Sequence, residues 1–192
     1  MNKRSAHESK RIILAAARTV FAEQGYSQAC MRDIARVAGM SVGGLYIYFH
    51  NKEDLFQTFM LEWMNNLNDR THEALTSLSD PVEAISAFIT ISIEFARTNK
   101  EMIILQGREW GVTFGTDLKK DFFAERRSII AAIIKKGIET GDFAQCDADR
   151  ASNVIFNMLR GFVISMVIDE DALFPAEDCV NLVVKGLLRR NY

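Results

Sequence analysis

Residues 31–52 read MRDIARVAGMSVGGLYIYFHNK and contain two short helical patterns on either side of a glycine turn. The apolar residues of 31–38 recur at three- and four-residue spacing, and Gly39 ends that segment. Residues 42–49 repeat the spacing, and Ser41 stands where it can cap the start of the second segment. Two short helices joined by a tight glycine-containing turn predict a helix-turn-helix, whose second helix can enter the major groove of DNA.

The rest of the chain also has the periodicity of helices. Asp80, Pro81 and Glu83 form a strong helix start, with a cap, a proline in the first turn and an acid at the third position. There is no strand alternation and no internal repeat in the sequence, so we predict an all-α fold. The expected helices cover approximately residues 12–24, 31–38, 42–49, 52–75, 81–99, 101–106, 118–139, 148–167 and 175–190.

The net charge hides an asymmetry along the chain. The whole sequence has 23 Lys+Arg and 25 Asp+Glu, a net charge of −2, whereas DNA-binding domains are often strongly basic. Residues 1–60, however, hold eight Lys+Arg and five Asp+Glu, and residues 61–192 hold fifteen and twenty. A basic N-terminal part before an acidic remainder is expected when only the first part contacts a polyanion. Ordinary scatter of surface charge is the alternative.

Composition indicates a soluble globular protein. The sequence is 48% hydrophobic and 25% charged with two prolines, which excludes disordered, collagen-like and disulfide-scaffold chains. Three cysteines without a CxxC pair argue against disulfides or a zinc site and favour a reducing compartment. The N-terminus lacks the apolar stretch of a secretory signal, and the longest uncharged apolar stretch is about half of the roughly 20 residues that span a membrane. We therefore expect a cytoplasmic protein without a membrane partner.

The N-terminal residues resemble a known family. The resemblance covers about residues 9–56 and rests on these residues in this order: Ala16, Phe21, Gly25-Tyr26, Ile34-Ala35, Ala38-Gly39, Leu45-Tyr46, Phe49 and Lys52-Glu53-Asp54-Leu55. Their order, spacing and type are similar to those of the tetracycline-repressor (TetR) family of bacterial transcription regulators. The remaining residues resemble that family only in length and helical character.

The resemblance implies an architecture and a function. The expected fold is an N-terminal three-helix helix-turn-helix DNA-binding domain, residues 1–52, followed by a helical ligand-binding and dimerisation domain, residues 53–192. Such a protein is expected to act as a repressor, binding double-stranded operator DNA as a homodimer and leaving it when a small-molecule effector binds.

The resemblance also implies which residues contact DNA. Arg32 matches a position that often contacts DNA, Lys52 matches the phosphate-contacting lysine of the family, and residues 42–48 match the recognition helix. We expect base contacts from Arg32, Val42 and one of the two recognition-helix tyrosines. The predicted DNA-binding residues are Arg32, Ser41, Val42, Gly43, Gly44, Tyr46, Ile47, Tyr48 and Lys52.

Three positions depart from the family pattern. Cys30 replaces the usual Thr or Ser cap before Arg32, so that helix is expected to start differently; a reactive thiol is the alternative. Gly44 replaces a common Thr, and each of the two consecutive glycines costs a helix about 1 kcal/mol relative to Ala while allowing a close backbone approach. DNA shape is then expected to carry more of the specificity. His50 can donate to a phosphate or be a solvated turn residue.

A released repressor needs a ligand pocket whose occupation disfavours the DNA-bound conformation. The candidate lining is rich in aromatic residues and Met, which suits an apolar or amphipathic ligand; such residues are individually more often ordinary core than ligand contacts. Arg108, Glu109 and Asn157 are further polar candidates, and the first two have a surface role as the alternative. The predicted lining residues are Trp63, Phe88, Phe95, Met102, Gln106, Trp110, Phe114, Phe122, Phe156 and Met158.

The last two expected helices are apolar on more than one face. Apolar residues nearly surround residues 154–167 and residues 180–188. A helix that is apolar on all sides must be covered on all sides. A second copy of the chain would cover both in a symmetric four-helix interface, and burial within the monomer is the alternative.

Two other classes of function compete with a DNA-binding regulator. The three histidines share no metal-ligand spacing with each other or with the cysteines, and the sequence has no phosphate loop or nucleophile elbow. We therefore predict no enzyme activity, catalytic residue, metal or cofactor. A helical carrier of hydrophobic ligands would explain the apolar remainder but not the basic N-terminal motif. DNA retention that weakens with added salt distinguishes the carrier from the regulator.

Overall fold

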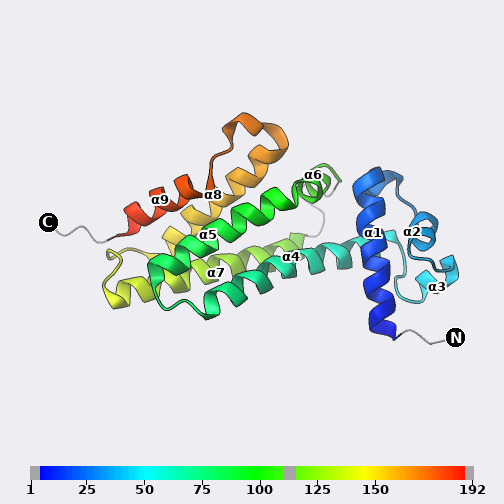
Figure 1. Ribbon diagram of the computed structural model, residues 1–192, viewed down its shortest axis with the longest axis horizontal. Coiled ribbons are helices and arrows are strands. Elements are labelled where there is room, and N and C mark those ends of the chain that lie inside the picture. The colour runs from blue at the N-terminus through cyan, green and yellow to red at the C-terminus, as the bar shows by residue number, and fades with distance from the viewer. Residues whose placement is uncertain (1–4, 110–115, 189–192) are drawn as a thin grey trace. The chain divides into compact units, whose positions relative to one another are not determined.

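The computed structural model describes residues 5–109 and 116–188, apart from the side chains of residues 105–118 (Figure 1). The described residues form helices and turns, and their only β-type pairing is an isolated bridge between Phe143 and Leu188. The all-α prediction is confirmed.

Contacts divide the chain into two compact units. The first unit comprises Met1–Met64 and Ile104–Gly115, and the second comprises Asn65–Ile103 and Thr116–Tyr192. The division falls inside α4 (Lys52–Thr76), so this one helix belongs to both units.

The first unit begins with the three helices expected from the sequence. They are α1 (Ala6–Gln28), α2 (Met31–Val37) and α3 (Val42–Tyr46). Gly25 has φ 75° near the end of α1, where the apolar periodicity stops, and Gly39 has φ 64° in the turn between α2 and α3. Both positions need the left-handed conformation that glycine adopts without steric cost.

The second helix of the pair is shorter than predicted. The spacing of apolar residues predicts a helix to Phe49, but α3 ends at Tyr46. The N–H groups of Tyr48 and Phe49 both bond to the carbonyl of Leu45, at 3.0 and 3.2 Å, so the chain leaves the helix through a turn. Two glycines in five residues give this segment little intrinsic helix stability.

The start of α4 is fixed by two reciprocal hydrogen bonds. Asn51 Oδ1 accepts from the N–H of Asp54 at 2.8 Å, and Asp54 Oδ2 accepts from the N–H of His50 at 2.9 Å. The His50 ring lies 3.3 Å from the same carboxylate and is exposed. These bonds satisfy N–H groups that a helix start leaves without partners.

A compact core holds the first unit together. Phe21 and Phe56 pack edge to face with ring centroids 4.9 Å apart, an arrangement that aromatic pairs prefer. The side chains that are at most 2% exposed in this core include Ile13, Ala17, Val20, Phe21, Ile34, Ala35, Leu45, Phe49, Leu55, Phe56 and Met60.

The second unit is a bundle of longer helices. Asp80 and Asp147 cap α5 and α8 through their carboxylates, as the sequence predicts. Pro175 is the residue before the last helix rather than its first residue. The elements after α4 are α5 (Pro81–Thr98), α6 (Lys100–Glu109), α7 (Thr116–Thr140), α8 (Ala148–Ile168), the short 3-10 helix η1 (Glu170–Ala172) and α9 (Ala176–Leu187).

The core of the second unit lies between α5, α7, α8 and α9. α7 packs on α8 and on α5, and α5 packs on α9 (Figure 1). Within the described residues, α8 alone is long and apolar enough to cross a membrane, which is weak evidence because core helices of soluble proteins pass the same test. The side chains that are at most 1% exposed include Phe88, Ile89, Ile93, Ile130, Ile134 and Phe162.

Candidate nucleic-acid interface and ligand site

α3 is short, capped and open to solvent. Ser41 Oγ accepts from the N–H of Gly44 at 3.0 Å, as expected of an N-cap. Leu45 is fully buried and anchors the helix, whereas Val42 and Tyr46 are 36% and 49% exposed. The helix therefore presents apolar and aromatic side chains that the unit itself does not bury.

The other predicted DNA-binding side chains lie in the same unit. Arg32 is exposed in the first turn of α2, which packs against α3. Ile47 is 79% exposed immediately after α3, and Tyr48 is half-buried. The helix-turn-helix thus exposes a cation together with several apolar or aromatic groups.

The two glycines of α3 have different surroundings. A Cβ atom at Gly43 would meet nothing within 4 Å, whereas a Cβ at Gly44 would lie 3.1 Å from Ser41 Oγ. Gly43 is exposed and Gly44 is half-buried. A larger residue therefore fits the fold at position 43, and one at position 44 would press on the cap.

The Lys52 ammonium lies against the end of α1. Its Nζ donates to the carbonyl oxygens of Tyr26, Ser27 and Ala29 at 2.6, 3.3 and 3.0 Å, and lies 4.4 Å from the centroid of the Tyr26 ring. Cations are favoured at carbonyl-rich helix ends and over aromatic faces. Lys52 therefore ties the start of α4 to α1, a role that the sequence analysis missed. Its phosphate contact stays a prediction.

Cys30 occupies the N-cap position of α2 without capping it. Its side chain makes no bond to the N–H groups of the helix; instead Sγ donates to Asp33 Oδ2 at 2.9 Å. This hydrogen bond is the main cause of the lowered pKa of Asp33. α2 nevertheless begins at Met31, where the apolar spacing starts.

The predicted ligand-lining residues fall mostly in the core of the second unit. Phe88, Phe95, Met102 and Phe156 are at most 6% exposed, and Phe122 and Met158 are half-buried. Trp63 is half-buried in the first unit, and Asn157 is exposed. Trp110 and Phe114 lie outside the described residues, as do the side chains of Gln106, Arg108 and Glu109.

The structure links two of these residues through a third that the sequence analysis did not select. The ring of Phe123 lies 5.7 Å from that of Phe122 and 5.4 Å from that of Phe156. Arg160 lies 5.1 Å from the centroid of Phe123, and Arg127 lies 5.6 Å from that of Phe156. Facing surfaces of α7 and α8 therefore combine aromatic rings with cations.

A buried guanidinium is the main polar group that the sequence analysis missed. Arg126 of α7 is 2% exposed and lies 4.1 Å from the ring centroid of Phe88. Its Nη1 donates to Thr71 Oγ1 of α4 at 2.7 Å, and its Nη2 donates to Ser92 Oγ of α5. One signal was available: Arg126 stands four residues from Phe122 and from Ile130, on an apolar helical stripe.

Burial makes the charge of Arg126 expensive. It lowers the pKa of Arg126 well below its ordinary value, to about 10, against a smaller opposing effect of Glu125. The difference corresponds to a cost of about 3 kcal/mol for holding the charge in the core. Because the folded state has the lower pKa, this charge disfavours folding below about pH 10, and the penalty is relieved as the pH rises above that value.

The acid next to Arg126 is engaged elsewhere. Glu125 accepts from Asn68 Nδ2 at 2.5 Å and lies 3.3 Å from the His72 ring. Asn68 is 5% exposed, and its Oδ1 is a buried acceptor with no partner among the described residues. The second unit therefore buries both a guanidinium and an unsatisfied amide oxygen.

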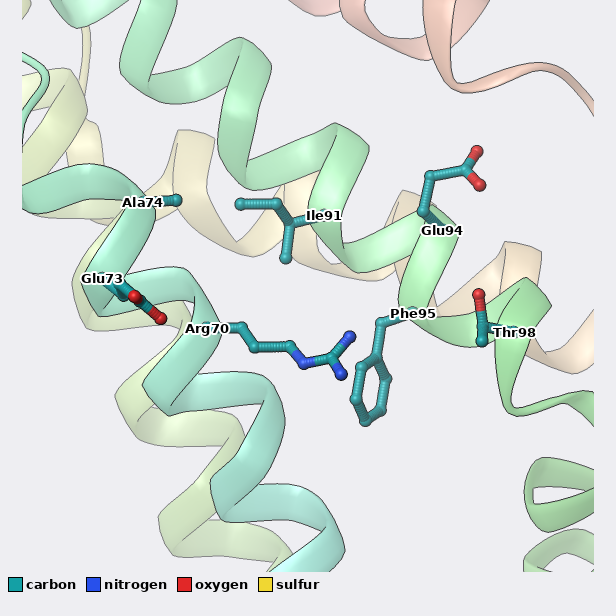
Figure 2. A pocket seen from close by; sticks show the side chains of 7 residues that line it. All are labelled: Arg70, Glu73, Ala74, Ile91, Glu94, Phe95 and Thr98. Carbon is teal, nitrogen blue, oxygen red and sulfur yellow. The ribbon is translucent and has the colours of Figure 1, made fainter.

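An open pocket of about 420 Å³ lies between α4 and α5, where Arg70 reaches toward the Phe95 ring at 5.7 Å (Figure 2). Glu73 and Glu94 also line this pocket. Of the predicted lining residues, it includes Phe95. Three charged residues line this pocket, so it does not match the apolar lining expected from the sequence.

A protein-family model matches the N-terminal part of the chain. The model of "Bacterial regulatory proteins, tetR family" matches residues 13–58, which cover most of α1, all of α2 and α3, and the first residues of α4. These are the elements whose exposed residues form the candidate nucleic-acid interface.

Similar proteins align along nearly the whole chain. The HTH-type transcriptional regulator YhgD of Bacillus subtilis (strain 168) is 25% identical, over 94% of this chain and 97% of its own. The fatty acid metabolism regulator protein of the same strain is 25% identical, over 91% and 93%. The crystal structure of the Bacillus subtilis regulator FadR in complex with stearoyl-CoA has a TM-score of 0.76, 24% identity and coverage of 92% and 98%, a likeness of fold.

Proposed function

Because the chain belongs to the tetR family of bacterial regulatory proteins, we propose that it binds a two-fold symmetric operator as a homodimer and is released by an amphipathic small molecule. Its relatives regulate transcription and are not enzymes, and the protein is a DNA-binding transcriptional regulator of the same kind. The observation that carries the proposal is the capped α3, which exposes Val42 and Tyr46 while Leu45 anchors it.

The proposed roles at DNA follow from exposure and chemistry. Arg32 and Tyr46 have donors that can reach base edges, and Val42 can contact a thymine methyl group. The exposed backbone at Gly43 allows a close approach to a phosphate or base. The proposed DNA-binding surface is completed by Ser41, Gly44, Ile47 and Tyr48, with Lys52 at the edge of this surface. The proposed DNA-binding domain is residues 1–52.

The proposed effector is a lipid-like amphiphile. One relative is named for fatty acid metabolism, and the FadR of similar fold was crystallised with stearoyl-CoA. The aromatic and Met side chains buried in the second unit, among them Phe88, Phe156 and Met102, supply the apolar surface that an acyl chain would need. Occupation of that unit would favour a conformation that binds DNA poorly.

The proposed dimer uses α8 and α9. Ile164 and Ile168 of α8 are 50% and 76% exposed, and Leu182 of α9 is 64% exposed. Each helix also has a buried face, so the monomer covers one side and leaves apolar residues on the other. A second copy of the chain would cover the exposed apolar residues of both helices. The proposed compartment of such a regulator is the cytoplasm.

DNA-binding titrations test the proposal. Genomic fragments captured by the purified protein supply the test duplex. Fluorescence anisotropy then measures the affinity for this duplex at salt concentrations between about 50 and 200 mM. If the protein contacts about six phosphates, the slope of log affinity against log salt is near −5. Equal affinity for captured and random duplexes, or no retention of DNA, would contradict the proposal and leave the hydrophobic-ligand carrier.

A further inference from the structure

Arg126 has hydrogen-bonding capacity that the described residues do not use. A guanidinium carries five N–H donors, and the two hydroxyls that it meets take one each from Nη1 and Nη2. Both hydroxyls are oriented by their own helices, because Thr71 Oγ1 donates to the Leu67 carbonyl at 2.7 Å and Ser92 Oγ to the Phe88 carbonyl at 2.6 Å. They therefore face the guanidinium with lone pairs.

No carboxylate among the described residues forms an ion pair with this guanidinium. The adjacent Glu125 is held by Asn68 and His72 instead. Holding a buried charge without an ion partner is costly, and ionisable groups whose pKa is strongly shifted by burial cluster at functional sites. The guanidinium of Arg126 therefore lacks an anionic or strongly polarised acceptor, which the described part of the chain does not supply.

Asn68 provides an independent indication of a missing partner. Its Oδ1 is buried and unbonded, and the bond from Nδ2 to Glu125 fixes the orientation of the amide, since a flipped amide would set an oxygen against a carboxylate. Asn68 stands three residues before Thr71 on one face of α4, and Glu125 precedes Arg126 on α7, so the two polar groups belong to the same contact between α4 and α7. A ligand that satisfies both needs an acceptor and a donor close together.

We propose that Arg126 and Asn68 bind the polar head of the effector, with an acyl oxygen accepting from the guanidinium and an O–H or N–H donating to the amide oxygen. The inference rests on the proposed function and identifies the residues that hold the ligand. The buried ring of Phe88 beside the guanidinium gives the adjoining hydrocarbon an apolar contact. A free carboxylic acid and an acyl-CoA thioester both supply the acyl oxygen, and the donor would be the acid O–H in the first and the amide N–H beyond the sulfur in the second, so both are tested.

The test uses full-length protein that retains its captured DNA. Isothermal titration calorimetry measures the Kd of dodecanoate, dodecanoyl-CoA and 1-dodecanol for the wild type and for Arg126→Met. We expect the variant to bind at least one acyl probe about tenfold or more weakly, and the alcohol, whose neutral oxygen is a weaker acceptor for the guanidinium, no more than about threefold more weakly. The probe that loses affinity identifies the acid or the thioester as the ligand form.

Two further variants make the result specific. Lys136→Met removes an exposed cation of α7 and is expected to leave all three Kd values within about twofold. Arg126→Lys keeps the charge but lacks the planar guanidinium with its several donors, so we expect it to lose part of the affinity for the acyl probes. This variant also provides a test if Arg126→Met does not fold. Replacing a buried charge with an apolar side chain of similar length is usually tolerated.

The inference is overturned if both Arg126 variants bind the acyl probes as the wild type does, or if the alcohol loses affinity equally. Wild-type protein that retains DNA but binds neither acyl probe would also overturn it. That last result leaves the regulator itself intact, because DNA retention is measured separately in the absence of probe.

Discussion

The Lys52 ammonium has three N–H donors, and three carbonyl oxygens at the end of α1 accept them. Lys52 therefore stabilises the first unit whether or not it also approaches a phosphate. We expect Lys52→Met to lower the free energy of unfolding by about 1–3 kcal/mol, because charge-assisted hydrogen bonds are lost. Urea denaturation measures this, with the exposed Lys185→Met of α9 as the control.

The same variant distinguishes the two roles of Lys52 at DNA. If the ammonium works only within the protein, the salt slope of DNA binding stays at the wild-type value while affinity falls. Removing a phosphate contact would instead reduce the magnitude of the slope by about 0.9. Anisotropy titrations at several salt concentrations measure the slope.

Gly43 offers a test of the backbone approach to DNA. Because a Cβ there meets nothing within 4 Å, Gly43→Ala should stabilise the isolated protein by up to about 1 kcal/mol and weaken operator binding by crowding the interface. Thermal melting and anisotropy measure the two effects. Gly44→Ala is the comparison, since its Cβ would press on Ser41 Oγ at 3.1 Å. Unchanged operator affinity in Gly43→Ala would count against a close approach at this residue.

Among the elements, the capped helix starts were easier to predict than the end of α3 or the buried polar contacts. Three helices are capped by Ser41, Asp80 and Asp147, each within three residues of the N–H groups that it binds. Because both partners of each bond are close in the sequence, the bond can be predicted from local residues alone. The end of α3 at Tyr46 was missed because apolar residues continue at helical spacing beyond it.

The partners of Lys52 and Arg126 could not be predicted in the same way. Lys52 bonds to residues at least 23 positions earlier, and Arg126 bonds to residues 55 and 34 positions earlier. Only the packing of helices brings such groups together. The predicted aromatic lining was chosen by composition, which does not separate ligand contacts from core.

The bond between α4 and α7 can be tested at Thr71. Thr71→Val preserves shape but leaves an N–H of the buried Arg126 without its acceptor, so we expect a loss of about 1–3 kcal/mol in the free energy of unfolding. Urea denaturation provides the value. Thr76→Val is a matched control, because exposed Thr76 makes the same bond to the carbonyl four residues earlier. Equal losses in both variants would show that the bond to Arg126 contributes nothing.

For the whole molecule, the exposed apolar residues of α8 and α9 predict self-association. We expect the double variant Ile164→Glu with Leu182→Glu to sediment as a monomer at micromolar concentration, since two charges would be buried in each half of the interface. Ile47→Glu makes the same change at an exposed residue of the first unit and should stay dimeric while losing DNA affinity. A double variant that remains dimeric would place the interface elsewhere.

A dimer with two helix-turn-helix units requires an operator of matching symmetry. Two recognition helices reach successive major-groove segments about 34–36 Å apart, which corresponds to half-sites about one turn of DNA apart or a multiple of it. The charge asymmetry of the sequence is consistent with this division, because the net positive charge lies in residues 1–60.

Hydroxyl-radical footprinting on genomic fragments captured by the protein is the most direct test of the account. We predict an inverted repeat with half-site centres about one helical turn, or a multiple of it, apart, and protection that is lost in Tyr46→Ala. Protection without symmetry, or capture of DNA without any preferred sequence, would contradict an operator-binding regulator.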